Sequence, residues 1–481
     1  MSQRRSSRSI IPLRLTAAVT VFVLAACAQL PAAGPIPQPK GAASLEAGAS
    51  FAAPAAAWPV EQWWRGYGDS QLDALIDEAM AGAPDMAAAL ARLRRADAAL
   101  QVTGAATRPQ LNASASISED RLSYNFMTPR AATPSGWNDY GRATLDFSWE
   151  IDFWGKNRAA LAAATSSLQA QGAELANARL LLAASIAADY AELSRLYADR
   201  ATLVQSVEVR RKTAQLFTQR FLNGLETRAG MREADARRAT AEGAQLALDE
   251  QIALQRNRLA ALLGAGPDRA LAITPPVLKL ERGFGLPATL AAELLGRRPD
   301  VTAARFQVAA LDHRVAESRA AFYPNIDLKA FVGVQSLGLD MLAHGDSAVG
   351  SIGPAISLPI FNGGRLRGQL RGAEADYAQA VANYDNTLVR ALREVADAAT
   401  SQQALGARLL KAQEAVDAAT EAHRVARNRY EGGLATYVEV LSAEDGYLNS
   451  LGPLTDLRAR SITLDIVLQR ALGGGYRLAA K

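Results

Sequence analysis

Four stretches of the chain alternate apolar and polar residues with a period of two, as expected for β-strands with one apolar face. Two of them lie between residues 111 and 149, and two lie between residues 326 and 356. Alternation over about ten residues is typical of strands that span an outer membrane, with apolar side chains toward lipid. We therefore predict two amphipathic hairpins, whose apolar positions are Leu111, Ala113, Ala115 and Ile117, then Ala143, Leu145, Phe147 and Trp149, then Ile326, Leu328, Ala330, Val332 and Val334, and more weakly Ala348, Ile352 and Ile356.

Two long segments, residues 156–266 and 361–452, favour helix because they lack proline and are rich in Ala, Leu, Gln, Glu and Arg. A helix over residues 156–222 would be about 100 Å long at 1.5 Å per residue. Glycine at the following turns, Gly224 and Gly432-Gly433, predicts that each long helix is followed by a returning helix. Seven-residue spacing indicates packing along a narrow seam, through Leu161, Leu168, Leu175 and Leu182 and through Leu370, Tyr377, Tyr384 and Ala391.

The two halves of the chain repeat each other. The segment from Pro84 recurs from Pro299, and Arg220 to Gly224 recurs as Arg429 to Gly433. A period above 200 residues is too long for a solenoid unit, so we predict a duplicated half-molecule. Between about residues 113 and 153 the first copy has about seven extra residues, where we expect a longer surface loop.

The first 27 residues predict export and lipid attachment. Four arginines between positions 4 and 14 precede the apolar run 15–26, which is too short and too one-sided in charge for a stable spanning helix. The run ends Leu24-Ala25-Ala26-Cys27, which resembles the lipobox of bacterial lipoproteins, where the signal is cut before a cysteine that becomes diacylated. Cys27 is the only cysteine, so a monomer can form no disulfide, and the alternative is an ordinary signal peptide with a chance cysteine.

Removal of the signal peptide changes the charge balance. The full chain has 52 basic and 48 acidic residues, and the signal holds four of the arginines and no acid. The remaining chain is formally neutral, so the charge gives no indication of nucleic-acid binding. Beyond the signal no run of about 18 apolar residues occurs, so a membrane would have to be crossed by a β-barrel.

Four strands are too few to close a membrane barrel, because the smallest have about eight. An open sheet edge in lipid would leave backbone groups unpaired at several kcal/mol each. Copies of the chain must therefore associate, with about eight strands in a dimer and about twelve in a trimer. Because side chains fill an eight-stranded barrel while larger barrels leave a channel, a conduit favours the trimer.

Several motifs, in this order, resemble those of the TolC-like outer-membrane efflux proteins, in particular the NodT-type efflux lipoproteins. The resemblance covers nearly all of the chain after the signal peptide. It is carried by Trp63-Trp64-Arg65-Gly66-Tyr67-Gly68-Asp69 with Leu72, Leu75 and Ile76, by Arg297-Arg298-Pro299-Asp300-Val301, by Leu358-Pro359-Ile360-Phe361-Asn362-Gly363-Gly364, and by Arg429-Tyr430, Gly433, Val440-Leu441 and Ala471-Leu472-Gly473-Gly474-Gly475.

The resemblance implies a mainly α-helical fold with a membrane β-barrel. Each half-unit would consist of two long antiparallel helices and a two-strand hairpin, and the chain would form a homotrimer with a 12-strand β-barrel on a 12-helix α-barrel. The protein would be a lipid-anchored exit duct of the bacterial outer membrane, extending into the periplasm. It would pass drugs and other small toxic compounds from an inner-membrane pump and a periplasmic adaptor (membrane fusion) protein, with no cofactor, metal or catalysis.

The same resemblance assigns the adaptor contact to the two helical turns. These turns carry Arg220, Gly224 and Thr227 in the first copy and Arg429, Gly433 and Thr436 in the second. Some relatives close this tip with acidic residues, whereas here the approach to the second turn is basic, which makes Arg424 and Arg427 a candidate gate that pairs with carboxylates. A second departure is Gly452-Pro453 within the last long helix, where we expect a bend.

Two other functions are considered. A duct for a secreted polypeptide would have the same sequence features, because specificity would lie in the pump. A non-conducting coiled-coil lipoprotein would not need four amphipathic strands. An enzyme is disfavoured because the three histidines, His313, His344 and His423, are far apart and no phosphate loop or nucleophile elbow occurs.

These patterns divide the chain into ten segments. They are a signal peptide (1–26), a lipid anchor and extended tether (27–57), an N-terminal helical segment (58–107), the first β-hairpin (108–154), the first long helical hairpin (155–266), a linker (267–298), a short helix of the second repeat (299–323), the second β-hairpin (324–360), the second long helical hairpin (361–475) and a tail (476–481).

Overall fold

The computed structural model describes residues 37–478, apart from 42–43, 46–49, 52, 126–128, 281–282 and 289. The predicted signal peptide and Cys27 lie outside these residues. The chain divides into two compact units, each assembled from segments of both halves of the sequence. Unit 1 contains Arg94–Ala170 and Arg305–Asn383, and unit 2 contains Lys40–Leu93, Gln171–Ala304 and Tyr384–Lys481.

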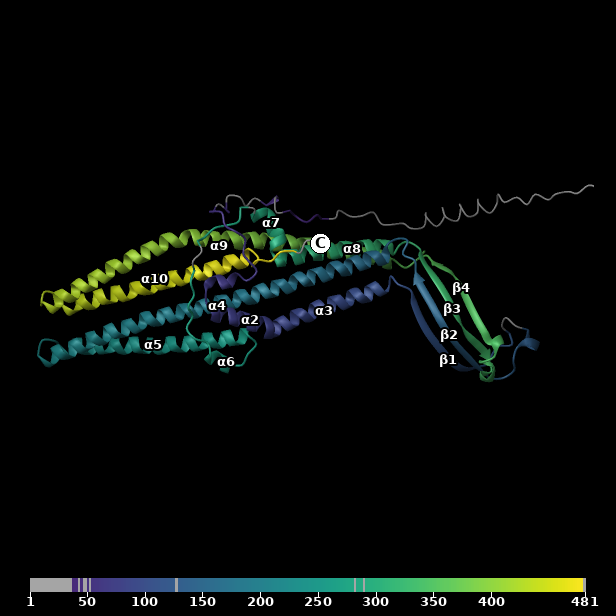
Figure 1. The fold of residues 1–481 in the computed structure, drawn as a ribbon, viewed down its shortest axis with the longest axis horizontal. Helices are drawn as coiled ribbons and strands as arrows, with labels where there is room; N and C mark the ends of the chain where they lie inside the picture. The colour runs from purple at the N-terminus through teal and green to yellow at the C-terminus, as the bar shows by residue number, and fades with distance from the viewer. Residues whose placement is uncertain are drawn as a thin grey trace, which may run out of the picture. The chain divides into compact units, whose positions relative to one another are not determined.

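The duplication is visible in the lengths of the helices (Figure 1). Helices α3 (Pro84–Ala105) and α8 (Pro299–Ala320) have 22 residues each. Helices α4 (Lys156–Leu222) and α9 (Arg365–Glu431) have 67 residues each, and α5 (Arg228–Leu262) and α10 (Tyr437–Ala471) have 35 each. Equal lengths at equivalent places confirm the duplicated half-molecule and its two long helical hairpins.

Unit 1 contains one antiparallel sheet of four strands in the order β1-β2-β3-β4. The strands are β1 (Gln110–Asp120), β2 (Asn138–Glu150), β3 (Asn325–Leu337) and β4 (Ala348–Ser357). All four predicted strands are present, including the weak last one. Residues 121–137 join the first pair and residues 338–347 join the second, so the extra residues of the first copy lie in its loop, as predicted.

The shorter elements are a 3-10 helix η2 (Trp63–Tyr67) and three helices, α2 (Ser70–Gly82), α6 (Asp268–Leu271) and α7 (Leu290–Arg297). Three further 3-10 turns, η3 (Arg130–Ala132), η4 (Leu339–Met341) and η5 (Gly345–Ser347), lie in the two strand connections.

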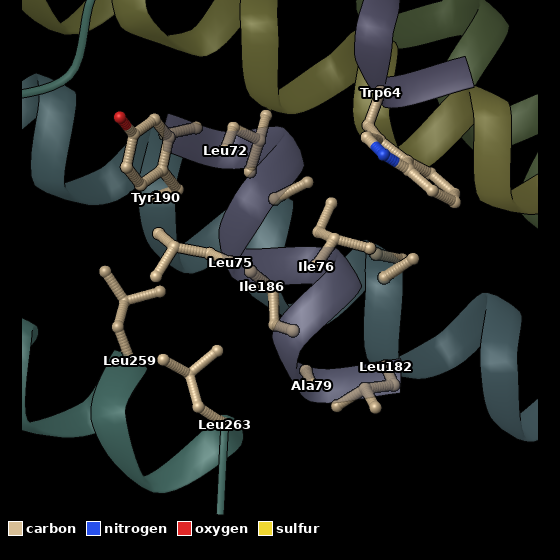
Figure 2. Packing of buried hydrophobic residues seen from close by; sticks show 14 of the residues in the cluster. Trp64, Leu72, Leu75, Ile76, Ala79, Leu182, Ile186, Tyr190, Leu259 and Leu263 are labelled. Carbon is tan, nitrogen blue, oxygen red and sulfur yellow. The ribbon is translucent and has the colours of Figure 1, made fainter. Parts of the chain in front are cut away.

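The main core of unit 2 forms around α2, where Leu75 and Ile76 lie among side chains of α4 and of the end of α5 (Figure 2). Leu75, Ile76, Ile186 and Leu259 are fully buried. Apolar residues recur on α2 at helical spacing, and burying each such side chain stabilises the fold by about 1.5–3 kcal/mol.

The first of the motifs quoted above, residues 63–69, directly precedes α2 and forms the N-terminal boundary of that core. Asp69 caps α2, because its carboxylate accepts hydrogen bonds from the backbone N–H groups of Gln71 and Leu72. The preceding Gly68 has φ 65°, the left-handed conformation that lets the 3-10 helix end there. The same carboxylate accepts the hydroxyl of Tyr190 on α4 at 2.9 Å, so the motif fastens α2 to the long helix.

The mid-chain motif is a buried ion cluster. Arg298, 6% exposed, donates to Asp300 at 2.7 Å, to Glu394 at 2.9 Å and to the carbonyl of Ala471 at 3.1 Å. Arginine can satisfy several acceptors at once because its guanidinium is a planar fork of donors. The start of the second repeat is thereby joined to α9 and to the end of α10.

Three consecutive glycines after α10, Gly473 to Gly475, pass through a space with no room for side chains. All three have positive φ, between 58° and 89°. A Cβ on Gly473 would lie 2.0 Å from the carbonyl oxygen of Arg297, and one on Gly475 would lie 2.2 Å from the backbone of Val60. The beginning, middle and end of the folded chain therefore meet at this glycine segment.

The bend expected at Gly452-Pro453 remains a prediction. Helix α10 runs from Tyr437 to Ala471 with Pro453 inside it. Proline supplies no N–H for the carbonyl of Asn449 one turn earlier, which removes one rung of the helical hydrogen-bond ladder.

Replacing Gly473 with Ala is expected to destabilise the protein by about 2 kcal/mol or more, because the residue combines positive φ with backbone contact. The measurement is thermal unfolding of the purified full-length protein in detergent, followed by circular dichroism. Gly266→Ala is the matched control, since a Cβ at that position would have nothing within 4 Å of it. Equal melting temperatures for the two variants would contradict the expectation.

Candidate functional site: an amphipathic sheet and two helical turns

The register of the sheet places the apolar residues of all four strands on one face. Leu111 pairs with Phe147, which pairs with Ala330, which pairs with Ile352. Neighbouring rows repeat this composition, and Leu111, Val332 and Ile352 are 67%, 62% and 77% exposed. The strands thus carry a continuous apolar surface that no described residue of the chain covers.

The opposite face is polar and internally hydrogen-bonded. Asp146 accepts hydrogen bonds from the hydroxyls of Ser114 at 2.8 Å and Thr144 at 3.0 Å. Arg142 lies over the ring of Phe331, with 5.2 Å from its guanidinium carbon to the ring centroid. This face can border water, whereas removal of the apolar face from water is favourable.

The two outer strands leave the sheet open. Strand β1 pairs only with β2 and β4 only with β3 among the described residues. Each therefore presents one row of unpaired backbone N–H and C=O groups to whatever lies beside it.

Exposed aromatic residues lie where the strands lead into the long helices. Phe153 and Trp154, after β2, are 62% and 50% exposed, and Phe361, at the equivalent place after β4, is 91% exposed. Trp154 stacks on Tyr323 at 4.7 Å and donates its indole N–H to the carbonyl of Pro324 at 2.9 Å. The exposed indole of Trp154 before α4 is therefore held in place by the residues that precede β3.

The predicted tip residues lie at the two turns of unit 2, and both threonines cap returning helices. Thr227 accepts the N–H of Gly230 at 3.0 Å at the start of α5. Thr436 forms a capping box with Glu439 at the start of α10. Gly224 and Gly433 have φ 70° and 73°, so both turns use glycine as predicted.

The two equivalent arginines of the turns have different partners. Arg429 stays within its own turn, where it donates to the carbonyl of Leu434 at 3.1 Å and lies 3.7 Å from Glu439. Arg220 instead lies over the ring of Tyr430 on the other hairpin, 4.5 Å from the centroid. The sequence repeat therefore does not extend to the contacts of these side chains.

Arg424 and Arg427 are exposed and paired along their own helix. Arg424 contacts Glu421 at 2.5 Å, and Arg427 contacts Glu431 at 2.9 Å, all on α9. Such i,i+3 and i,i+4 pairs on an exposed helix surface are screened by solvent and contribute little to stability.

Several polar contacts between the two hairpins pair residues that the sequence analysis did not place together. Asp445 of α10 accepts Arg210 of α4 at 3.0 Å and Arg237 of α5 at 2.5 Å. Glu444, 1% exposed, accepts the hydroxyl of Thr213 of α4 at 2.7 Å. The available signal in the sequence was the pair of adjacent acidic residues, Glu444 and Asp445, on an otherwise apolar seam. The arginine partners of Asp445 could not be recognised, because they are more than 200 residues away in sequence.

An aromatic cluster lies nearer the turns and also joins the hairpins. Phe217 of α4 stacks on Tyr430 at 6.0 Å and meets Tyr437 edge-on at 5.4 Å. Burial, with the nearby Glu226 acting in the same direction, raises the pKa of the Tyr430 hydroxyl despite Arg220. That hydroxyl therefore stays protonated and donates to Glu226 at 3.3 Å.

The described residues contain neither a cluster of metal ligands nor a membrane-spanning helix. Within that part of the chain, no group of three or more His, Cys, Asp or Glu residues could hold a metal ion. No helix among the same residues is long and apolar enough to cross a membrane.

Comparison with known proteins identifies the family. The model of the outer membrane efflux protein family matches residues 75–265 and 290–474, one match for each half of the chain. The chain belongs to the outer membrane efflux protein family. It is thus an efflux protein of the bacterial outer membrane, as the motifs predicted, and the family is one of transport proteins.

Individual relatives cover most of the chain. The multidrug resistance outer membrane protein MdtP of Escherichia coli is 33% identical over 429 residues, which are 88% of either chain. The fusaric acid resistance protein FusA of Burkholderia cepacia is 37% identical over 76% of this chain and 69% of its own. The crystal structure of the outer membrane protein VceC of Vibrio cholerae superposes with a TM-score of 0.83 at 47% identity, covering 87% of this chain and all of that one.

Replacing Asp445 with Asn should loosen α10 from α4 and α5, because one substitution weakens two ion pairs that join the hairpins. Since these groups are partly exposed, the expected loss is about 1 kcal/mol. Amide hydrogen exchange of residues 437–452 in the full-length protein measures it, and faster exchange is expected. Glu431→Gln is the control, because its ion pair stays within α9. Exchange as slow as in the unsubstituted protein would contradict the assignment.

Proposed function

We propose that three copies of the chain form an exit duct for small molecules through the outer membrane. Their sheets would close into a 12-strand barrel and their long hairpins into a 12-helix tunnel. The amphipathic sheet with two open edges carries the proposal, because neither its bare apolar face nor its unpaired edge groups suit a monomer in water. Pairing β4 of one copy with β1 of the next satisfies both edges and keeps every apolar row on the lipid side.

The aromatic junctions support the placement of this sheet in a membrane. Phe153, Trp154 and Phe361 are exposed directly beyond the strands. Aromatic residues are enriched at the boundary between hydrocarbon and water, where an apolar ring and a polar group can both be accommodated. Lipid would thus contact the apolar face and this boundary. We propose no nucleic-acid partner.

For the cargo, we propose organic compounds that are toxic to the cell. The support is that one relative is named for multidrug resistance and another for fusaric acid resistance. The duct itself would be passive, with the energy supplied by an inner-membrane pump.

For the partner, we propose that a periplasmic adaptor protein binds the two helical turns, at Arg220, Gly224, Thr227, Arg429, Gly433 and Thr436. Four exposed apolar side chains at the same turns, Leu222, Leu225, Leu434 and Val438, are between 58% and 76% exposed. Exposed leucines next to glycine turns are apolar anchors of the kind that protein interfaces bury. Arg424 and Arg427 remain candidate gate residues, which would have to exchange their partners on α9 for carboxylates of another copy.

We further propose that Cys27 carries the lipid anchor. The lipobox-like sequence before it supports this assignment, and mass spectrometry of the mature protein tests it, since diacylation adds the mass of the lipid to the chain from residue 27.

Single-channel conductance of the detergent-extracted protein in a planar bilayer tests the duct, with the oligomeric mass measured on the same sample. A trimeric mass with stable conductance is the expected result. A monomer that does not insert into the bilayer would contradict the proposal. A trimer with little conductance would point to a closed tip, and substitution of Arg424 and Arg427 would then be expected to raise the conductance.

The two faces of β3 allow a matched prediction. Val332→Arg places a charge on the apolar face and should reduce assembly of trimers in the outer membrane, at a cost of about 2–4 kcal/mol. Gln335→Glu, which places a charge on the polar face of the same strand and opposite Arg142, should assemble normally. The readout is the amount of heat-modifiable trimer in the outer-membrane fraction. Equal assembly of both variants would mean that the apolar face does not meet lipid.

A further inference from the structure

The first turns of α4 and α9 carry arginines at the same position with different surroundings. Arg158 and Arg367 are each the third residue of their helix. The guanidinium of Arg158 forms an ion pair at 3.3 Å with Asp152, which lies four residues before the start of α4. At the same distance before α9 the chain has Phe361, which is 91% exposed. The second half of the chain thus has an exposed aromatic ring in place of the carboxylate that compensates the arginine in the first half.

Arg367 and Arg371 form a cationic pair that the chain itself leaves without a partner. The two residues are one helical turn apart, so they share one face of α9. Both are exposed, and neither side chain has an ion pair or a hydrogen bond with any residue that the structure describes. Ile360 and Phe361, shortly before the helix, are 79% and 91% exposed. Cations next to exposed apolar side chains suit a partner in which an anionic group adjoins hydrocarbon.

The segment that leads back toward Cys27 contacts the same face of α9. The backbone N–H of Lys40 donates to the carboxylate of Asp385 at 3.0 Å. Asp385 follows Arg367 by 18 residues, which is five turns of about 3.6 residues, so both lie on one face of this continuous helix. A tether from a lipid anchor has to run along the outside of a duct. The face that carries Arg367 and Arg371 would therefore be the outer one.

The lengths of chain agree with a membrane surface near these arginines. Lys40 follows Cys27 by 13 residues, which can span at most about 45 Å. Along α9 the rise from Asp385 back to Arg367 is about 27 Å at 1.5 Å per residue. A lipid anchor at Cys27 can therefore reach the level at which α9 begins.

We propose that Arg367 and Arg371 bind the phosphate of a phospholipid headgroup in the leaflet of the outer membrane that faces the periplasm. Two guanidinium groups one turn apart can donate to one phosphate, and such charge-assisted hydrogen bonds are about twice as strong as neutral ones. Phe361 would lie beside the acyl chains of the same lipid. The inference deepens the proposed function and rests on it, because the sheet has to lie in the membrane. The arginine pair would fix how deep the barrel sits in the bilayer.

Native mass spectrometry of the full-length protein, incubated with phosphatidylglycerol in detergent, tests the site. The double variant Arg367→Gln, Arg371→Gln should bind this lipid on the order of thirty-fold more weakly, because two arginine contacts with an anionic headgroup are lost. The double variant Arg314→Gln, Arg393→Gln is the matched control. It removes the same charge from exposed arginines that pair with carboxylates of their own helices, and it should bind the lipid as the unsubstituted protein does.

Equal binding by the two double variants would overturn the inference. Equal binding of phosphatidylglycerol and of a diacylglycerol without the phosphate by the unsubstituted protein would also overturn it. Loss of trimeric mass in the Arg367→Gln, Arg371→Gln protein would do the same, because the arginines would then bind carboxylates of a neighbouring copy.

Conductance measured on the same samples separates the lipid site from the duct. Conducting trimers whose lipid binding does not depend on Arg367 and Arg371 contradict the lipid site alone. Lipid binding that depends on these arginines, in a protein that does not conduct, contradicts the duct alone.

Discussion

Unpaired backbone groups at the edges of the four-stranded sheet are the constraint that determines how the rest of the protein can be used. An edge in water can bond to solvent, but the sheet also has an apolar face that water does not favour. An environment that suits the apolar face deprives the edges of solvent partners. Association of several sheets would satisfy both demands, and this is the reason for which we propose that copies of the chain assemble.

The long hairpins of unit 2 solve a different problem. Their seams are buried alanines, leucines and tyrosines, such as Ala187, Leu388 and Tyr384, which allow close packing but little directional preference. Register between the hairpins is therefore fixed by a few polar contacts, chiefly those of Glu444 and Asp445.

Much of the fold could be predicted from the sequence, because each element follows a local rule. The period-two alternation located all four strands, and the glycines at 224 and 433 located both turns. The internal repeat supported the predicted helices independently of periodicity, because each half of the chain has one helix of 67 residues and one of 35 residues. The triple-glycine segment was quoted only as a motif, and its reason, contact with backbone from Arg297 and Val60, exists only once the chain is folded.

The polar contacts between hairpins could not be predicted, because a helix surface offers every charged residue several partners. The basic character of the approach to the second turn draws attention to Arg424 and Arg427, yet the structure pairs both with carboxylates of their own helix. Duplication makes the choice harder still: Arg220 and Arg429 occupy equivalent positions, but only Arg220 reaches the opposite hairpin. Once a half-molecule is doubled, its two turns no longer have identical neighbours, so one arginine can hold its own turn while the other joins the two hairpins. The different partners of equivalent residues are therefore a consequence of doubling the chain within one fold.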